Sequence, residues 1–184
     1  MTTGTAEVPT AESQRPLTLG RFTVAGIVLG VVLSFAVFGF TPDAVVASVF
    51  ASTLVVLAAI DLERRIIPNR IVLPATAIVL VLNIAAHPSQ WVEWVGASAA
   101  AFAFFLIVAL INPAGLGMGD VKLALLIGAG LGWDVAAALI LGTLAAAVYA
   151  VVLVLTRPGA GAKTAFAMGP FLAGGALVAL FFVH

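Results

Sequence analysis

The chain has 184 residues, of which 63% are hydrophobic and 9% are charged, and its mean hydropathy is +1.24. Soluble domains carry about 25% charged residues and cannot bury so much apolar surface, so this composition excludes an ordinary water-soluble fold and indicates a protein surrounded by membrane lipid. The formal net charge of zero gives no reason to expect a nucleic acid as partner, and the absence of cysteine excludes disulfides and thiolate metal sites.

The chain divides into a polar tail and a membrane domain. Residues 1–20 are rich in Thr, Glu and Pro and lack the pattern of a signal peptide, which predicts a disordered cytosolic tail. About 20 apolar residues are needed to cross the hydrocarbon core. On that basis residues 21–184 are predicted to form an all-α, polytopic membrane helical bundle of about seven transmembrane helices. The predicted spans are 22–40, 44–60, 71–86, 92–111, 121–132, 135–156 and 166–183.

The positions of the cations predict the orientation of these spans. With seven spans and a cytosolic N-terminus, every Lys and Arg falls on the cytosolic side, as the positive-inside rule expects. These cations are Arg15, Arg21, Arg64, Arg65, Arg70, Lys122, Arg157 and Lys163. The opposite loops, 41–43, 87–91 and 132–134, carry neither Lys nor Arg. We therefore expect a multi-pass protein of the cell membrane, with its C-terminus outside.

Two of the eight acidic residues need a special explanation, because charge near the hydrocarbon boundary is costly. Asp61 ends the uncharged stretch 44–60, and Asp120 precedes the predicted helix 121–132, which at about 18 Å is too short for a core of about 30 Å. The predicted topology puts both on the cytosolic face. The acids predicted outside are explained by helix caps or solvated helix ends. These are Asp43, Glu93 and Asp134.

Gly117 and Gly119 flank Met118 immediately before Asp120. Irregular backbone below the membrane surface is tolerated only where it lines a cavity or is buried in protein. Glycines have a use in such a recess, because they let a substrate backbone approach closely and permit positive φ. The short span 121–132 thus leaves two alternatives: either the helix starts earlier in the chain, or Asp120 lies below the membrane surface in a glycine-lined recess.

A pair of carboxylates at one face can perform acid–base chemistry. Two carboxylates in a partly desolvated cleft share one proton, since both cannot easily ionise. The ionised member then takes a proton from water while the protonated member polarises a scissile carbonyl. Without Cys and with His87 and His184 far apart in the sequence, no metal site is expected. The alternative, that Asp61 and Asp120 merely end and cap helices, leaves their pairing unexplained.

Three segments resemble motifs of the type IV prepilin peptidases. Asp61-Leu-Glu-Arg-Arg-Ile-Ile-Pro-Asn-Arg-Ile-Val-Leu-Pro74 resembles their first catalytic motif, in which Pro-Asn or Pro-Asp follows seven residues after the Asp. Gly117-Met-Gly-Asp-Val-Lys-Leu123 resembles the second, Gly-x-Gly-Asp-x-Lys, and Met168-Gly-Pro-Phe-Leu172 resembles a Gly-Pro-Phe-Leu element. The residues that the resemblance implies as support for the site are Pro68, Asn69, Gly117, Gly119, Lys122, Gly169 and Pro170.

This resemblance implies a membrane aspartic endopeptidase with Asp61 and Asp120 as its catalytic residues. It would cleave the leader from prepilins, pseudopilins or related precursors, which serve type IV pili and protein secretion, at the cytosolic membrane edge. No metal and no cofactor would take part. Larger bacterial members of the family carry an additional N-terminal region with paired Cys-x-x-Cys and methyltransferase activity. Because this chain has a short N-terminus and no cysteine, we expect the short, peptidase-only form.

Three other functions remain as alternatives. A different GxGD intramembrane protease, of the presenilin or signal-peptide-peptidase kind, would carry Tyr-Asp upstream, whereas Ile60 precedes Asp61 and the single tyrosine is Tyr149. A proton-coupled membrane transporter would need polar residues in the middle of several spans, and these spans are almost purely apolar. A structural membrane scaffold would leave the paired motifs without an explanation.

Overall fold

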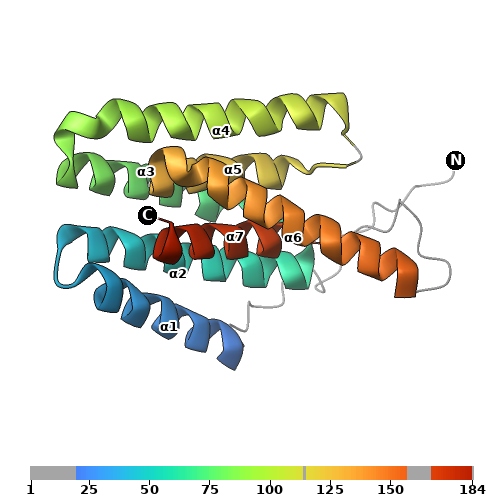
Figure 1. The fold of residues 1–184 in the computed structure, drawn as a ribbon, viewed down its shortest axis with the longest axis horizontal. Helices are drawn as coiled ribbons and strands as arrows, with labels where there is room; N and C mark the ends of the chain where they lie inside the picture. The colour runs from blue at the N-terminus through green and yellow to red at the C-terminus, as the bar shows by residue number, and fades with distance from the viewer. Residues whose placement is uncertain (1–19, 114, 157–166, 184) are drawn as a thin grey trace, which may run out of the picture.

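The computed structural model describes residues 20–113, 115–156 and 167–183, and these residues form a bundle of α-helices (Figure 1). The helices are α1 (Arg21–Phe38), α2 (Pro42–Arg64), α3 (Asn69–Ala86), α4 (Trp91–Ile111), α5 (Met118–Leu131), α6 (Val135–Thr156) and α7 (Gly169–Phe182). Short 3-10 helices, Pro88–Gln90 and Gly132–Asp134, lead into α4 and α6. The described residues contain no strand, so the all-α class is confirmed. Residues 1–19 of the predicted tail lie outside the described residues.

The lengths of the apolar helices bear on the predicted count of seven membrane spans. Five stretches of the described chain are long and apolar enough to cross a membrane. They are Arg21–Phe38, Pro42–Arg64, Asn69–Ala86, Pro88–Ile111 and Met118–Thr156, the last of which joins α5 to α6. α7 is apolar but has only 14 residues, as does α5 taken alone. A polytopic membrane bundle is confirmed, whereas the predicted count of seven spans is not.

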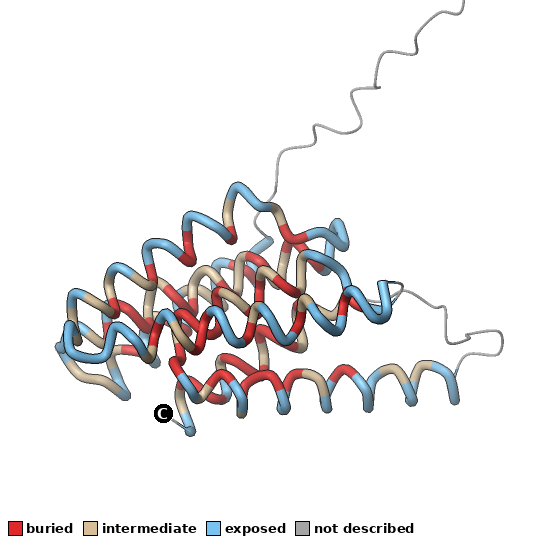
Figure 2. Tube along the Cα trace, turned by 90° about the horizontal axis from the view of Figure 1, so that it is seen from above, coloured by how far each residue is buried: buried red, intermediate tan, exposed pale blue. Residues whose placement is uncertain are grey.

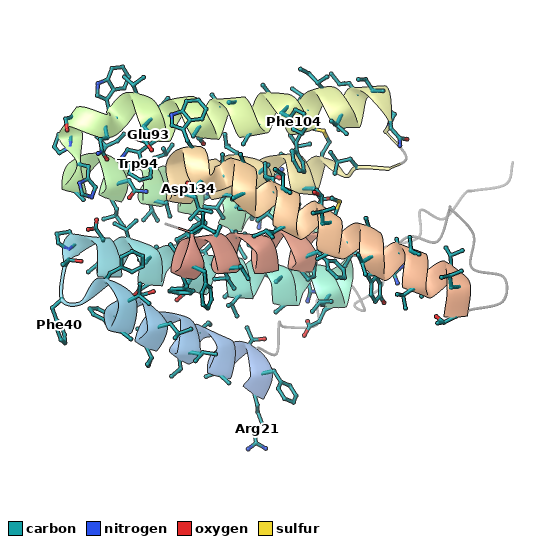
Figure 3. The ribbon with its side chains drawn as sticks, viewed as in Figure 1. Arg21, Phe40, Glu93, Trp94, Phe104 and Asp134 are labelled. Carbon is teal, nitrogen blue, oxygen red and sulfur yellow. The ribbon has the colours of Figure 1, made fainter. Side chains whose placement is uncertain are left out.

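The bundle has two ends, because the chain reverses direction between successive helices (Figure 1). We call the end where α2, α4 and α6 finish and where α3, α5 and α7 begin the Asp61 end, on the right in Figure 1. The opposite end, where α3 finishes and α4 begins, is the His87 end. In Figure 3, Glu93 and Trp94 of α4 lie toward this second end, as do Phe40 and Asp134.

The buried residues lie on the inward faces of the helices, and the exposed residues lie on the outer faces (Figure 2). Many of the exposed residues are large and apolar. α5 is buried along most of its length, with Val121, Leu126 and Ile127 fully inaccessible, and it packs against α3, α4 and α7. Leu29 of α1 and Val148 of α6 are more than half exposed. An apolar outer surface of this kind fits lipid as the surrounding solvent.

Glycines permit the closest helix contacts of the core. A Cβ atom on Gly128 of α5 would lie 2.6 Å from the Ser98 Cα atom on α4. A Cβ atom on Gly175 of α7 would lie 2.5 Å from the Gly142 nitrogen on α6 and would also collide with the Ala138 carbonyl oxygen. Close backbone approach through small residues is how helices associate in membranes, where burial of apolar surface supplies little driving force.

Gly175→Ala should therefore lower the melting temperature of the protein in detergent. The colliding atoms belong to the backbone and cannot move aside as a side chain can, and overpacking of a well-filled core costs about 1–3 kcal/mol. Gly174→Ala is the matched control, because a Cβ atom there would meet nothing within 4 Å. Thermal unfolding followed by circular dichroism measures both variants. Equal melting temperatures would contradict the tight packing of α6 on α7.

Candidate active site

Asp61 and Asp120 line one pocket at the Asp61 end of the bundle, although they come from different helices. The pocket has a volume of about 360 Å³ and lies where α2 ends and where α3 and α5 begin. Its lining residues are Asp61, Arg65, Ile66, Ile67, Asn69, Gly117, Met118, Gly119, Asp120 and Lys122. The structure thus brings together both predicted aspartates and four of the seven predicted supporting residues.

Asp61 lies in the last turn of α2 and is buried, with 6% of its surface exposed. The Gly169 backbone N–H donates a hydrogen bond of 3.0 Å to Asp61 Oδ2. Gly169 is the first residue of α7, and its N–H is one of the amide groups that have no partner within a helix. The start of α7, and so the third sequence motif, therefore holds the first aspartate in place.

The lack of a side chain at Gly169 is required by this contact. A Cβ atom there would lie 2.7 Å from Asp61 Oδ2, closer than real Cβ atoms approach other atoms. Pro170, the next residue, occupies the first turn of α7, where a missing N–H costs nothing. Neither Pro170 nor Pro68 lines the pocket; Pro68 precedes α3 as its N-cap residue. Both prolines thus start helices instead of touching the pocket.

Asp120 lies in the first turn of α5 and is partly exposed to the pocket. Its carboxylate interacts electrostatically with that of Asp61. A Cβ atom on Gly117 would lie 3.4 Å from Asp120 Oδ2, so glycine leaves the space beside this carboxylate open. The backbone of the first turn of a helix also favours a negative charge at this position.

The structure corrects two details of the Gly117–Asp120 segment. The predicted span 121–132 begins after Asp120, whereas α5 begins at Met118 and includes Asp120, so of the two alternatives the earlier helix start is the one observed. The glycines were expected to permit positive φ, but Gly117 has φ −76° and Gly119 is helical. Among the described glycines, positive φ occurs only at Gly39 and Gly132. Gly119 has a packing role instead, since a Cβ atom there would lie 3.1 Å from Ile67 Cβ.

The first and second motifs are connected by a side-chain hydrogen bond. Lys122 Nζ donates to Asn69 Oδ1 at 2.7 Å, which joins α5 to the start of α3. Arg65 also lines the pocket, which the sequence analysis missed. Arg65 ends α2 in the left-handed conformation, with φ 54° and ψ 36°, and its N–H donates to the Asp61 carbonyl oxygen. The sequence signal for this turn is Pro68, because a helix normally ends before a proline.

The described residues contain no group of three or more His, Cys, Asp or Glu side chains that could hold a metal ion. The chemistry within reach of this pocket is therefore that of two carboxylates from α2 and α5, with one lysine and one arginine nearby. That neither metal nor cofactor takes part stays a prediction.

Comparison with known proteins identifies the family of this chain. A sequence model described as the type IV leader peptidase family matches residues 48–156, more than half of the chain, including both aspartates. A prepilin leader peptidase/N-methyltransferase of Bacillus subtilis (strain 168) is 33% identical over 120 residues, which cover 65% of this chain and 48% of that protein. A prepilin leader peptidase/N-methyltransferase of Stutzerimonas stutzeri is 29% identical over 149 residues, which cover 78% of this chain and 51% of that protein.

The chain spans about half the length of these curated relatives. No solved structure matches it. The match of the family model over more than half of the chain nevertheless settles its classification. The chain belongs to the type IV leader peptidase family.

Proposed function

We propose that this protein is a membrane aspartic endopeptidase that removes the leader from type IV prepilin-like precursors. The observation that carries the proposal is the meeting of Asp61 and Asp120 in one pocket at one end of an apolar bundle. Both relatives are named prepilin leader peptidase/N-methyltransferase, and this chain matches about half of each. Their name supports prepilins as the substrate class of this chain. Membrane lipid is the surrounding partner in this proposal, and nucleic acid has no part in it.

In the proposed mechanism the two carboxylates share a single proton. The ionised carboxylate takes a proton from a water molecule, whose oxygen attacks the scissile carbonyl carbon, while the protonated carboxylate donates its proton to the carbonyl oxygen. When the tetrahedral intermediate collapses, a proton passes to the leaving amine nitrogen. Gly169 fixes Asp61 Oδ2 during these steps, and the Asn69–Lys122 hydrogen bond fixes the start of α3 against α5.

The alternative of a proton-coupled transporter finds little support in the described residues. Among the residues that the structure describes, Asp61 is the one buried acidic or basic side chain. Three of the buried polar side chains within the helices donate to backbone oxygens: Thr76 to that of Val72, Asn83 to that of Ala129 and Ser98 to that of Leu125. A proton relay needs a series of titratable groups across the bundle, and the described part of the chain has no such series leading inward from the two aspartates.

The direct test is co-expression with candidate prepilins and pseudopilins in a host that lacks its own peptidase. Cleavage appears as a faster-migrating product on a gel, and mass spectrometry of its new N-terminus identifies the bond cut. Uncleaved precursor in the absence of this protein is the control. Failure to process every member of a panel that a known prepilin peptidase cleaves in the same host would overturn the proposed activity.

The activity is expected to fall at both low and high pH. A dyad works only in its singly protonated form, so acid adds a second proton and removes the base, while alkali removes the shared proton and with it the acid. The rate of cleavage in detergent, measured against pH with a peptide precursor, should be bell-shaped and unaffected by EDTA. Inhibition by EDTA that one divalent ion relieves would instead favour a metal-dependent mechanism.

We further propose that the protein lies in the cell membrane with the Asp61 end and the N-terminus facing the cytosol. The described cations lie at the Asp61 end, near the start or end of a helix: Arg21, Arg64, Arg65, Arg70 and Lys122. The acidic residues Asp43, Glu93 and Asp134 lie at the His87 end, where the described chain has no Lys or Arg. This asymmetry is what the positive-inside rule expects.

Cysteine labelling tests this orientation, because the sequence contains no cysteine. In intact cells, Ser89→Cys at the His87 end should react with a membrane-impermeant thiol reagent, whereas Arg64→Cys at the Asp61 end should react only after the membrane is opened. Both positions are exposed, so the difference reports the side of the membrane. The opposite labelling pattern would reverse the orientation and move the aspartates outside.

A further inference from the structure

A second recess lies on the outer side of the bundle, between α4 and α6. Its volume is about 330 Å³. At the His87 end α4 lies against the start of α6, where a Cβ atom on Gly96 would lie 3.7 Å from Trp133 Cζ2, and α6 then runs obliquely away from α4 (Figure 1). Figure 3 shows Phe104 in the half of α4 nearer the Asp61 end. We call this recess the α4–α6 groove, and its walls on the two helices are Phe104, Phe105, Val108, Leu139, Ile140 and Thr143.

The side chains of the α4–α6 groove are almost entirely apolar. Thr143 carries the one hydroxyl among them, and this hydroxyl donates to the Leu139 carbonyl oxygen at 2.6 Å, within its own helix. Phe104 and Ile140 are more than half exposed, so the groove opens outward to the lipid. A charged or strongly polar ligand would lose its hydration there and find no partner, which is costly. The groove therefore fits an apolar occupant.

The shape of the groove suits a helix. Phe104 and Val108 are four residues apart on α4, and Leu139 and Thr143 are four residues apart on α6. Side chains at this spacing lie one above the other and form a ridge along the helix. Helices pack by placing a ridge of one between the ridges of others, and in lipid their association depends on this packing. The two ridges therefore provide a seat for a third apolar helix.

The groove ends beside the two segments that hold the aspartates. Leu116 and Met168 complete its lining at the Asp61 end. Leu116 directly precedes Gly117, which lines the aspartate pocket, and Met168 directly precedes Gly169, whose N–H donates to Asp61 Oδ2. Consecutive Cα atoms are about 3.8 Å apart, so each of these segments begins about one residue's length from the groove wall. The groove and the aspartate pocket are thus continuous along the chain.

We propose that the α4–α6 groove holds the apolar α-helix by which an uncleaved precursor is anchored in the membrane. The helix enters sideways from the lipid, so its apolar surface never has to meet water. Its end at Leu116 and Met168 places the adjoining backbone, which carries the scissile bond, beside Asp61 and Asp120. This proposal rests on the proposed function, because it concerns the membrane-held part of the same substrate.

Disulfide trapping tests the position of the helix, because the sequence contains no cysteine. Val108→Cys is combined with Asp61→Asn, which keeps the precursor uncleaved, and with precursors that carry single cysteines along the apolar helix. After oxidation in membranes we expect crosslinked product at precursor positions three or four residues apart. Leu110→Cys is the matched control, since it is exposed but lies about 200° around α4 from Val108. Equal crosslinking of Val108→Cys and Leu110→Cys would overturn the proposal.

Filling the groove tests its role in cleavage. Val108→Trp should raise KM for a full precursor at least tenfold with little change in kcat, because the larger ring occupies the groove while both aspartates are untouched. The rise in KM should be absent for a short peptide that spans the scissile bond but lacks the apolar helix. Leu110→Trp, on the opposite face of α4, is the control and should cleave both substrates like the unaltered protein.

The two substrates separate a failure of this proposal from a failure of the proposed function. An unchanged KM for the full precursor in Val108→Trp would overturn the groove as a helix site and leave a lipid acyl chain as its occupant, with the cleavage activity standing. An equal loss with the short peptide would show that the substitution disturbs the dyad, and would also overturn the proposal. If the unaltered protein cleaved neither substrate, the proposed function itself would fall, and this proposal with it.

Discussion

Asp61→Asn and Asp120→Asn are each expected to abolish leader cleavage while leaving insertion and folding intact. Asparagine has nearly the shape of aspartate but can neither accept the proton of water nor donate one to the carbonyl. General acid–base catalysis contributes about 10²–10⁴-fold to a rate, and residues that act as a unit lose most of the activity when either is removed. The loss should therefore reach about 10³-fold for either variant, measured by gel shift of a co-expressed precursor.

Glu63→Gln is the matched control for both variants. Glu63 lies two residues from Asp61 in the last turn of α2, but it is exposed and does not line the pocket. Removal of its charge should leave cleavage close to the unaltered rate. Near-normal processing by either asparagine variant would disprove the dyad, and equal losses in all three variants would indicate a general effect of negative charge at this end of the bundle.

The sequence predicts the helices better than it predicts where they start and end. Apolar length identifies every α-helix of the described chain, because lipid imposes a simple rule on span length. It misplaces the last turn of α2 and the first turn of α5. Leu62–Arg64 is polar and Met118–Asp120 contains a glycine, yet both segments are helical. Polar residues at a helix end lie at the membrane surface, where hydropathy no longer distinguishes helix from loop.

The aspartate pair was predictable and its surroundings were not. Asp61 and Asp120 follow from topology, because both come at the cytosolic ends of their predicted spans. The hydrogen bond from Gly169 to Asp61 joins residues 108 positions apart and depends on how α7 packs against α2. Likewise, local sequence explains Asp43 as a helix cap, whereas in the structure it pairs with His87. Contacts between distant helices leave no periodic signal in a single sequence.

Gly169→Ala is expected to remove most of the catalytic activity although it adds only one methyl group. The new Cβ atom would lie 2.7 Å from Asp61 Oδ2 and 3.1 Å from Cγ, so the carboxylate must move. Its hydrogen bond from the Gly169 N–H would be lost or lengthened. A displacement of about 1 Å at a catalytic group costs about 10²-fold in rate. We expect kcat to fall by this factor with little change in KM, because Gly169 does not line the pocket that is proposed to receive the leader.

A double-substitution cycle distinguishes this positioning role from a simple weakening of α7. Gly169→Ala should lower the melting temperature in the unaltered protein but much less in an Asp61→Ala background, because the colliding carboxylate atoms are then absent. Gly174→Ala, in the same helix with open space around its Cβ position, should have the same small effect in both backgrounds. If Gly169→Ala lowered the melting temperature equally in both backgrounds, the strain would lie within α7 itself. The third motif would then serve only to start that helix, and Asp61 would be held in place by α2 alone.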